Sequence, residues 1–399
     1  MNRKPHLAIL GAGPTGLDAA LAAAEASLPF SVYEAADHVA AYLRQWGHVR
    51  LFSPWNMNVS PRIQRALASL GTPAPQGSGC PTGHELTDRI FQPLAGSPGI
   101  APHLHLGTRV EAVGRQGLLK NQAIGDPVRK QHRFRLLVRN RGGELRTALA
   151  DVVLDCTGTY GQPNPTGDGG IPAPGEELFD HRIVRTIPDF AANPGPWAGN
   201  RILLVGAGHS AQTAVTGLAA LAEDHPGTSV VWAMRRDQAE WPLADSDPLP
   251  GRAQLIQCAQ TLARGASDHV RCQTGVVVDS IAEKNGRMSV TLRHHNGHLQ
   301  TEDVDRILSL TGFSGDHLLY RQLQVHECWA TSGPMKLAAS LLAESSADCL
   351  DQTSHGPETL VNPEPDFFIL GSKSYGRNST FLMRVGWQQV DDVFTLLLA

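Results

Sequence analysis

Two glycine-rich segments with the same spacing constrain the fold of this chain more than any other feature. They are GAGPTG, with Gly11, Gly13 and Gly16, and GAGHSA, with Gly206, Gly208 and Ala211. Each follows a short apolar run and precedes a stretch rich in alanine and leucine. A strand, a glycine turn and a helix in this order predict the first half of a βαβ unit with parallel strands. The chain is therefore expected to contain two such units.

The residues around the first segment complete the βαβ pattern. Residues 6–10 (HLAIL) predict a buried strand, Leu17–Ala26 predict a helix, and FSVYE predicts a second strand that ends at Glu34. A carboxylate in this place can accept hydrogen bonds from the diol of a ribose. The alternative is a tight turn in an unrelated α/β domain.

Each residue of the first glycine loop has a separate expected role. Gly11 allows the tight turn, Gly13 lets the backbone approach a pyrophosphate, and Gly16 permits close packing of helix on strand. Pro14 and Thr15 are expected to contact the cofactor as well, and the free N–H groups and dipole of the helix that follows favour phosphate. The segment therefore predicts a dinucleotide site.

The second unit ends differently. Residues 201–205 (RILLV) predict a strand, a helix runs from Ser210 to about Ala222, and SVVWAM is followed by Arg235 and Arg236. Arginine pairs with phosphate through its planar fork, so this pocket should favour the 2′-phosphate of NADP(H). A solvated strand end is the alternative. An acidic first site and a basic second site predict FAD first and NADPH second, with hydride passing from nicotinamide to flavin.

Length, charge and cysteine spacing exclude several classes of protein. A length of 399 residues predicts two or three domains, and a net charge of −4 gives no reason to expect nucleic acid or an acidic membrane. The apolar stretch Leu7–Ala26 is interrupted by glycines and charges, so we expect no membrane span. The six cysteines show no CxxC spacing, which argues against zinc and against a redox disulfide and fits a reducing cytoplasm. We expect no metal, and a homodimer is one of the oligomeric states left open.

Four further segments resemble a known family. They are CPTGHEL at 80–86, LDCTG at 154–158, LTGF at 310–313 (preceded by Asp305) and FFILGSKSYGRNSTFL at 367–382. With the two glycine loops, they resemble the two-dinucleotide-binding-domain flavoproteins, and most of all the flavin-containing and N-hydroxylating monooxygenases. The resemblance implies an α/β fold with two Rossmann-like domains, each with a β-meander, the NADPH domain (164–305) being inserted in an FAD domain made of 1–163 and 306–399.

The resemblance also implies cofactor contacts and meander strands. The implied contacts outside the glycine loops are Val110, Thr157, Gly158, Thr311, Gly312 and Gly371, together with His209 on the pyrophosphate or nicotinamide. The expected strands lie near 108–113, 132–139 and 148–154 in the first domain, and near 276–281, 288–293 and 301–308 in the second.

The segment 45–61 (QWGHVRLFSPWNMNVSP) is the expected wall of the flavin site. Trp46, Phe52 and Trp55 could shield the ring. Arg50 could hold an anionic flavin or a substrate carboxylate, and His48 could act as an acid or base. Asn58, or else Asn56, resembles the monooxygenase asparagine near the reactive flavin atoms. The alternative is a surface turn with aromatic core residues. The loop 239–252 could cover the nicotinamide.

One departure from the family bears on the reaction. Monooxygenases of this kind carry FxGxxxH between the two loops, but FDHRIVR at 179–185 keeps only Phe179, with His181 for the glycine and Arg185 for the histidine. The leading prediction is an NADPH-dependent monooxygenase that uses oxygen to oxidise nitrogen or sulfur (or carbon) of a small molecule through a C4a-(hydro)peroxyflavin. The alternative is a cysteine-independent reductase or dehydrogenase passing electrons to a small or protein acceptor. A flavin-binding sensor is a third, less favoured class.

Overall fold

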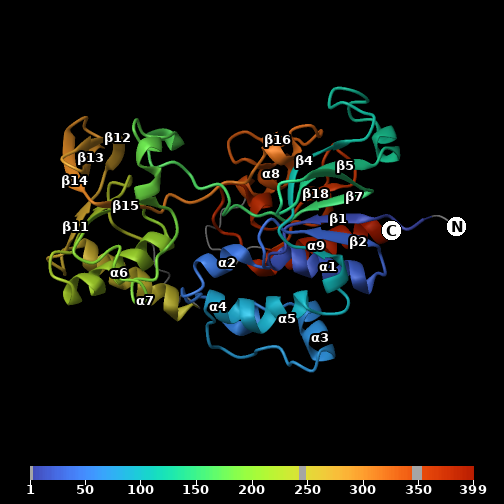
Figure 1. Ribbon diagram of the computed structural model, residues 1–399, viewed down its shortest axis with the longest axis horizontal. Coiled ribbons are helices and arrows are strands. Elements are labelled where there is room, and N and C mark those ends of the chain that lie inside the picture. Colours follow the sequence, from blue (N-terminus) through green and yellow to red (C-terminus); the bar gives the residue numbers. More distant parts are fainter. Residues whose placement is uncertain (1–2, 242–248, 344–352) are drawn as a thin grey trace. The chain divides into compact units, whose positions relative to one another are not determined.

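The computed structural model describes residues 3–241, 249–343 and 353–399 (Figure 1). The chain forms two compact units. The first unit comprises Met1–Gly47, Ser53–Gln162 and Phe313–Ala399, and the second comprises His48–Phe52 and Pro163–Gly312. Each unit is described below by itself.

The first unit is built on a five-stranded parallel sheet in the order β18-β7-β1-β2-β3. The strands are β1 (Leu7–Leu10), β2 (Phe30–Tyr33), β3 (Leu104–His105), β7 (Val152–Asp155) and β18 (Phe367–Ile369). Helix α1 (Pro14–Glu25) packs against β1, β2 and helix α9 (Met383–Leu398). The glycine loop therefore lies at the carboxyl edge of the sheet, where ligands of such folds bind.

An antiparallel meander covers the other face of this sheet (Figure 1). It consists of β4 (Arg109–Arg115), β5 (Phe134–Arg139) and β6 (Leu145–Ala150). Phe134, Leu136 and Val138 of β5 point into a core shared with Ala8 and Leu10 of β1, and Val110 packs on its edge. This alternation of buried and exposed residues along β5 is typical of a strand with one solvated face.

The second unit repeats this plan. Its parallel sheet has the order β11-β10-β9-β15-β8, formed by β8 (Ile183–Val184), β9 (Arg201–Val205), β10 (Ser229–Ala233), β11 (Val270–Gln273) and β15 (Arg306–Ser309). Helices α6 (His209–Asp224) and α7 (Pro250–Ala263) contact each other and this sheet. The meander consists of β12 (Val276–Lys284), β13 (Arg287–His294) and β14 (Leu299–Val304).

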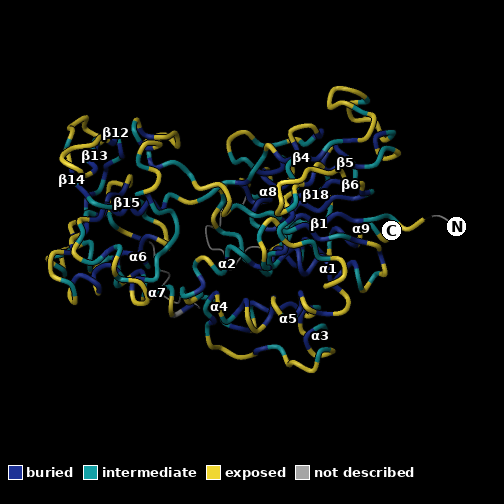
Figure 2. The backbone as a smooth tube through the Cα atoms, in the orientation of Figure 1, coloured by how far each residue is buried: buried dark blue, intermediate teal, exposed yellow. Residues whose placement is uncertain are grey.

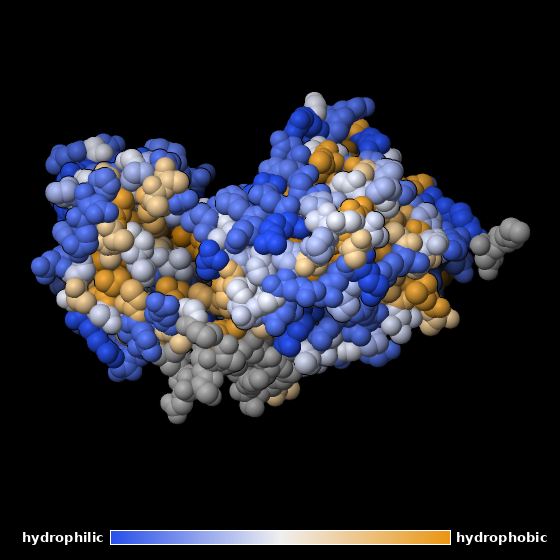
Figure 3. Space-filling view, turned by 90° about the horizontal axis from the view of Figure 1, so that it is seen from below, coloured by the Kyte–Doolittle hydropathy of each residue, from blue (hydrophilic) through white to orange (hydrophobic). Residues whose placement is uncertain are grey.

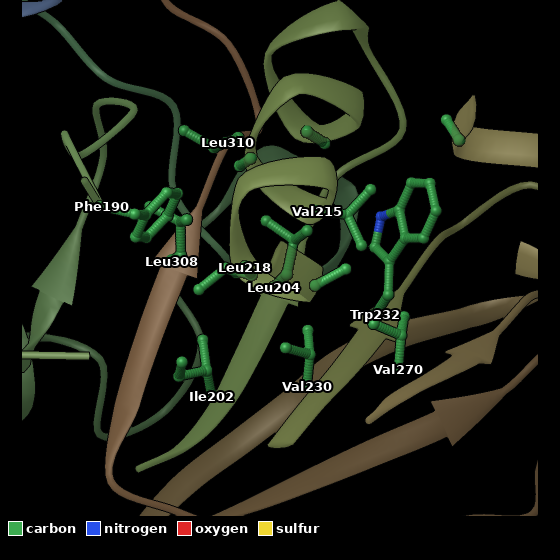
Figure 4. Packing of buried hydrophobic residues seen from close by; sticks show 14 of the residues in the cluster. Phe190, Ile202, Leu204, Val215, Leu218, Val230, Trp232, Val270, Leu308 and Leu310 are labelled. Atoms are coloured by element: carbon green, nitrogen blue, oxygen red, sulfur yellow. The ribbon is translucent and has the colours of Figure 1, made fainter. Parts of the chain in front are cut away.

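Strand β9 shows how the two faces of the second sheet are filled. Ile202 and Leu204 pack with Val215 and Leu218 of α6 (Figure 4), whereas Leu203 faces the meander core. Strands β1 and β7 are buried along their length, and β9 and β15 are buried except at their ends (Figure 2). Burial on both sides explains why these strands are continuous apolar runs in the sequence.

The predicted fold class is confirmed, but the predicted bounds of two strands are wrong. The predicted strands 148–154 and 301–308 are each two strands, separated at Asp151 and Asp305. Asp151 Oδ2 accepts a hydrogen bond from His6 N at 2.7 Å, and Asp305 Oδ2 accepts one from Arg201 N at 2.9 Å. Each aspartate thus marks the corner where the chain leaves the meander and enters the parallel sheet. An uninterrupted β-forming run does not reveal such a corner.

The remaining α-helices and strands lie in the first unit. They are helices α2 (Ala41–Gln45), α3 (Pro61–Ser69), α4 (Gly83–Leu86), α5 (Gln92–Ala95) and α8 (Met335–Ala343) and the hairpin of β16 (Glu327–Cys328) and β17 (Gly333–Pro334). Within the described residues no helix is long and apolar enough to cross a membrane. On the face shown in Figure 3, hydrophobic residues form separate patches among hydrophilic ones.

Candidate functional site

The first glycine loop is packed so tightly that side chains are excluded at two of its three glycines. A Cβ on Gly11, whose φ is +95°, would lie 2.7 Å from the Cys156 carbonyl oxygen, and one on Gly16 would lie 1.9 Å from the Gly11 oxygen. At Gly13, by contrast, no described atom lies within 4 Å of such a Cβ. The roles predicted for these glycines match this geometry: close packing at the ends of the loop and open space in its middle.

Glu34 closes this loop. Its carboxylate accepts hydrogen bonds from Ala12 N at 2.7 Å and Ala36 N at 2.9 Å. The side chain is thus fixed between the glycine loop and the end of β2, where a ribose diol would meet it. Gly13 is the N-cap of α1 and no described side chain caps this helix. Its first N–H groups are therefore open to an anion.

The C-terminal segment meets the same helix. Gly371, with φ of +74°, approaches Thr15 so closely that a Cβ would lie 2.9 Å from Thr15 Oγ1. Gly371 N also donates to Gln389 Oε1 of α9 at 2.8 Å. The segment resembling the family's flavin-contacting turn is therefore brought to the glycine loop, although 355 positions separate Gly371 from Gly16. These residues fit an FAD site.

A buried ion pair lies beside this turn and was missed by the sequence analysis. Lys373 Nζ is 2.6 Å from Asp155 Oδ2 and 3.2 Å from Thr157 Oγ1, and both charged side chains are fully buried. Asp155 Oδ1 also accepts from Thr157 N at 3.1 Å. The pair thus fixes Thr157 and Gly158 against the segment that follows β18. A lysine within a largely apolar C-terminal run was the only available signal.

The second loop has the same construction. A Cβ on Gly206, whose φ is +134°, would lie 2.4 Å from the Leu310 carbonyl oxygen, and the Ala211 Cβ is the next side-chain contact at 3.5 Å. Gly208 is open in the same way as Gly13, and no described side chain caps α6. His209 and Ser210, both exposed, form its first turn. The loop fits a second pyrophosphate.

The end of the second unit is held by reciprocal bonds. Thr311 Oγ1 donates to Asn164 O at 3.0 Å, Asn164 N donates to Gly312 O at 2.9 Å, and Asn164 Nδ2 donates to Thr311 O at 3.1 Å. Arg235 and Arg236 are exposed and follow β10, where a 2′-phosphate would be expected.

The structure divides the segment predicted as a flavin wall. Trp46 belongs to the first unit, and its ring lies 6.2 Å from that of Tyr160. His48–Phe52, which includes the exposed Arg50, belongs to the second unit. There the Phe52 ring meets the His209 ring edge-on at 5.4 Å. This contact joins Phe52 to the second glycine loop.

The two candidate asparagines differ in their surroundings. Asn56 is exposed, whereas Asn58 is buried. Asn58 Nδ2 donates to Ser53 O at 2.8 Å and to Pro54 O at 2.9 Å, and its Oδ1 accepts from Ser53 Oγ at 3.0 Å. The amide of Asn58 therefore stabilises the turn 53–58, and its part in oxygen chemistry stays a prediction.

The segment that departs from the monooxygenase motif is an ion-paired corner. Arg185 contacts Asp180 at 2.6 Å and the buried Glu176 at 3.2 Å. Glu176 also accepts from Thr166 N, which holds the start of the second unit's long segment in place. The Arg185 side chain therefore stabilises this corner through its two ion pairs. Of the loop predicted to cover the nicotinamide, residues 242–248 lie outside the described residues, as does Cys349.

A hydrogen-bonded cluster of His317, Tyr320 and Glu327 in the first unit was also not predicted. His317 Nδ1 lies 2.5 Å from Glu327 Oε1 and 2.7 Å from the Tyr320 hydroxyl, which also donates to Glu327. Burial raises the pKa of Glu327, but the hydrogen bonds from His317 and Tyr320 outweigh it and leave this pKa below its usual value. The Lys373 ammonium lies 4.9 Å from the centre of the Tyr320 ring, which connects the cluster to the buried ion pair.

Comparison with known proteins supports the fold. No model of a known protein family and no curated protein sequence matches the chain. Among solved structures, bacillithiol disulfide reductase from Bacillus cereus is similar over 99% of this chain and 98% of its own, with a TM-score of 0.72 and 16% identity. The fold is that of the two-dinucleotide-domain flavoproteins.

Monooxygenases of this fold are also among the neighbours. The ornithine N-hydroxylase of Kutzneria sp. 744 covers 99% of both chains with a TM-score of 0.65 and 14% identity. The flavin-containing monooxygenase of Stenotrophomonas maltophilia covers 99% of this chain and 98% of its own, with a TM-score of 0.60 and 17% identity. The fold-level resemblance predicted from the sequence is thus confirmed, and it is shared by reductases and monooxygenases.

Proposed function

We propose that the protein is an oxidoreductase that binds FAD on the first unit and NADPH on the second. The observation that carries this proposal is the contrast between two equivalent glycine loops. Glu34 closes the first with an acceptor for a ribose, and Arg235 and Arg236 follow the second with donors for a phosphate. Both loops keep the open, uncapped helix N-terminus that a pyrophosphate requires.

The favoured reaction is the oxidation of nitrogen or sulfur in a small molecule. When bound, NADPH and FAD would supply the two electrons for this reaction, and molecular oxygen would be the oxidant. One oxygen atom joins the substrate, and the other leaves as water with two protons, one of which comes from solvent. The protein's part is to bind both cofactors, orient them and exclude water. Support comes from the monooxygenase neighbours. The described cysteines form no disulfide with one another, which fits a monooxygenase and a cysteine-independent reductase equally: Cys80, Cys156, Cys258, Cys272 and Cys328.

Cys156, the thiol beside the first glycine loop, does not suggest a disulfide reductase. It lies beside the first glycine loop and is buried. Burial, together with the negative charges of Asp155 and Asp18, raises the pKa of its thiol well above the usual value. A thiol reacts as the thiolate, so Cys156 is expected to be inert.

The second candidate is a reductase that passes electrons to an acceptor other than oxygen. Two observations favour it. The side-chain amide of Asn58 donates its hydrogen bonds to the backbone of its own turn. Arg185 forms an ion pair at the position where the monooxygenase motif has histidine. The bacillithiol disulfide reductase among the neighbours shares the fold.

The fate of the electrons separates the two candidates. NADPH oxidation by the FAD-loaded protein would be followed in air and without oxygen, with ornithine, cadaverine and a thioether as trial substrates and a quinone and a disulfide as trial acceptors. The monooxygenase predicts oxygen consumption matched by oxidised amine or sulfur product. Rapid anaerobic turnover with the quinone or disulfide, and only hydrogen peroxide in air, would contradict it and favour the reductase.

A further inference from the structure

Two tryptophans hold the second glycine loop from the same side. Trp232 Nε1 donates to the Gly206 carbonyl oxygen at 2.8 Å, and Trp241 Nε1 donates to the Ala207 carbonyl oxygen at 2.6 Å. Their rings are stacked, with centroids 5.7 Å apart and planes inclined by 14°. Figure 4 shows the Trp232 side chain rising from β10 beside Val215 of α6. Consecutive carbonyl groups of the loop are therefore fixed by one indole stack.

An arginine packs against one ring of this tryptophan pair. The Arg236 guanidinium lies over the Trp241 ring, 5.3 Å from its centre, and Arg236 Nη1 donates to Glu240 O at 2.5 Å. The Trp241 backbone is in turn held by Gln260 of α7, whose Nε2 donates to Trp241 O at 3.2 Å. Among the contacts between described residues, one face and one nitrogen of the guanidinium are thus engaged, and the Nε and Nη2 edge is the one suited to a planar, two-point contact with phosphate.

We propose that Trp241 is the positioning residue that sets the preference for NADPH over NADH, by presenting Arg236 to the 2′-phosphate. This proposal rests on the proposed function, because it concerns the same cofactor site. The proposal also gives the two arginines different roles. Arg236, which lies over the Trp241 ring, makes the stronger contact with the 2′-phosphate, and Arg235 the weaker one. Trp241 acts on the pyrophosphate part of either cofactor through Ala207, and on the 2′-phosphate through Arg236.

Trp232 provides a matched comparison. It makes the same kind of hydrogen bond to the loop, but among the described residues the cation–π contact of Arg236 is with Trp241. Loss of the Trp232 bond should therefore weaken NADPH and NADH equally. Loss of the Trp241 ring should weaken NADPH more than NADH. A purely structural role for Trp241 would not produce this difference.

The test is a double-mutant cycle on cofactor binding rather than on turnover. Dissociation constants of NADP⁺ and NAD⁺ would be measured by calorimetry on the oxidised, FAD-loaded wild type, Arg236→Ala, Trp241→Leu and the double variant. Arg235→Ala and Trp232→Phe are the matched controls. Flavin content and thermal unfolding would show that each variant is folded. Trp241→Met, which also removes the ring, stands in if Trp241→Leu does not fold, and Trp241→Phe, which keeps a ring but loses the N–H, is a further control.

The expected results are specific to NADP⁺. Arg236→Ala weakens NADP⁺ about tenfold or more and leaves NAD⁺ nearly unchanged, while Arg235→Ala has the smaller effect. Trp241→Leu lowers the NADP⁺ preference about two- to fivefold, the size of an exposed cation–π contact, but lowers it no further once Arg236 is alanine. Trp232→Phe and Trp241→Phe weaken both cofactors and largely keep the preference.

Contrary results fall into two kinds. If Trp241→Leu leaves the NADP⁺ preference intact, or reduces it equally in the Arg236→Ala background, the positioning role is wrong while the cofactor assignment stands. If the FAD-loaded wild type binds neither NADP⁺ nor NAD⁺, the proposed function itself is overturned, and the role of Trp241 with it.

Discussion

The two glycine loops share a backbone but are held by opposite chemistry. In the first, a carboxylate accepts hydrogen bonds: Glu34 takes the N–H groups of Ala12 and Ala36. In the second, side chains donate them: Trp232 and Trp241 bond to the carbonyl groups of Gly206 and Ala207. The first loop is therefore held by a charged acceptor, and the second by neutral donors, one of which also packs against the cationic Arg236. We propose that the first arrangement suits a ribose diol and the second a 2′-phosphate.

The largest expected difference lies at the third position of the motif. Gly16→Ala would place a Cβ 1.9 Å from the Gly11 oxygen, so the loop has to shift and bound FAD should be lost almost completely. The matched change Ala211→Gly removes only a methyl group and should leave NADP⁺ binding within about threefold of wild type. Flavin-to-protein ratio and NADP⁺ calorimetry measure the two effects. Retention of stoichiometric FAD by Gly16→Ala would break the comparison.

A smaller effect is expected from the acidic group that closes the first loop. Glu34→Ala removes two charge-assisted hydrogen bonds to Ala12 and Ala36 as well as the expected ribose contact, so FAD affinity should fall about a thousandfold. Glu34→Gln, which keeps an acceptor oxygen, should lose less. Titration of apoprotein with FAD, followed by flavin fluorescence, gives both values. Equal affinities in Glu34→Ala and wild type would show that the carboxylate is incidental.

The smallest effect concerns the helices that follow the loops. Asp18 in α1 is buried, whereas the matching position in α6 is Thr213. Burial raises the pKa of Asp18 from 3.8 to about 6, although Arg62 and Ser60 oppose the change. Because the folded state holds this proton more tightly than the unfolded state, the contribution of Asp18 to stability is full below the unfolded pKa and is lost as pH rises through the folded one.

The corresponding measurement is denaturant unfolding of wild type and Asp18→Asn at several pH values. The free energy of unfolding of wild type, relative to Asp18→Asn, should fall by about 2 kcal/mol between about pH 4 and about pH 7. A difference that does not vary with pH, or that grows as pH rises, would mean that Arg62 keeps the carboxylate ionised throughout.

Local sequence patterns were sufficient for the fold and for much of each loop. Glycines at fixed spacing, apolar runs and the residue that follows the second strand all lie within about thirty positions, so their physical roles can be read together. The corners at Asp151 and Asp305 were not predicted, since both lie inside continuous β-forming runs and act by accepting hydrogen bonds from the backbone at the start of β1 and of β9.

The remaining site features depend on contacts between distant residues. Asp155 and Lys373 are 218 positions apart, and Trp241 bonds to Ala207 across 34. Neither pair belongs to a motif, and a buried lysine or a tryptophan after a strand has no distinctive signature. The segment 45–61 shows the opposite difficulty: its residues are contiguous, but the structure assigns His48–Phe52 to the second unit and its neighbours to the first.

Reduction of the flavin by the pyridine nucleotide tests the central claim most directly. Purified protein loaded with FAD would be mixed anaerobically with one equivalent of NADPH or of NADH while the flavin absorbance is recorded. The account predicts that NADPH bleaches the flavin completely and much faster than NADH does, because Arg236 meets the 2′-phosphate. A protein that binds no FAD, or whose bound FAD neither nucleotide reduces, would contradict the assignment of the two loops.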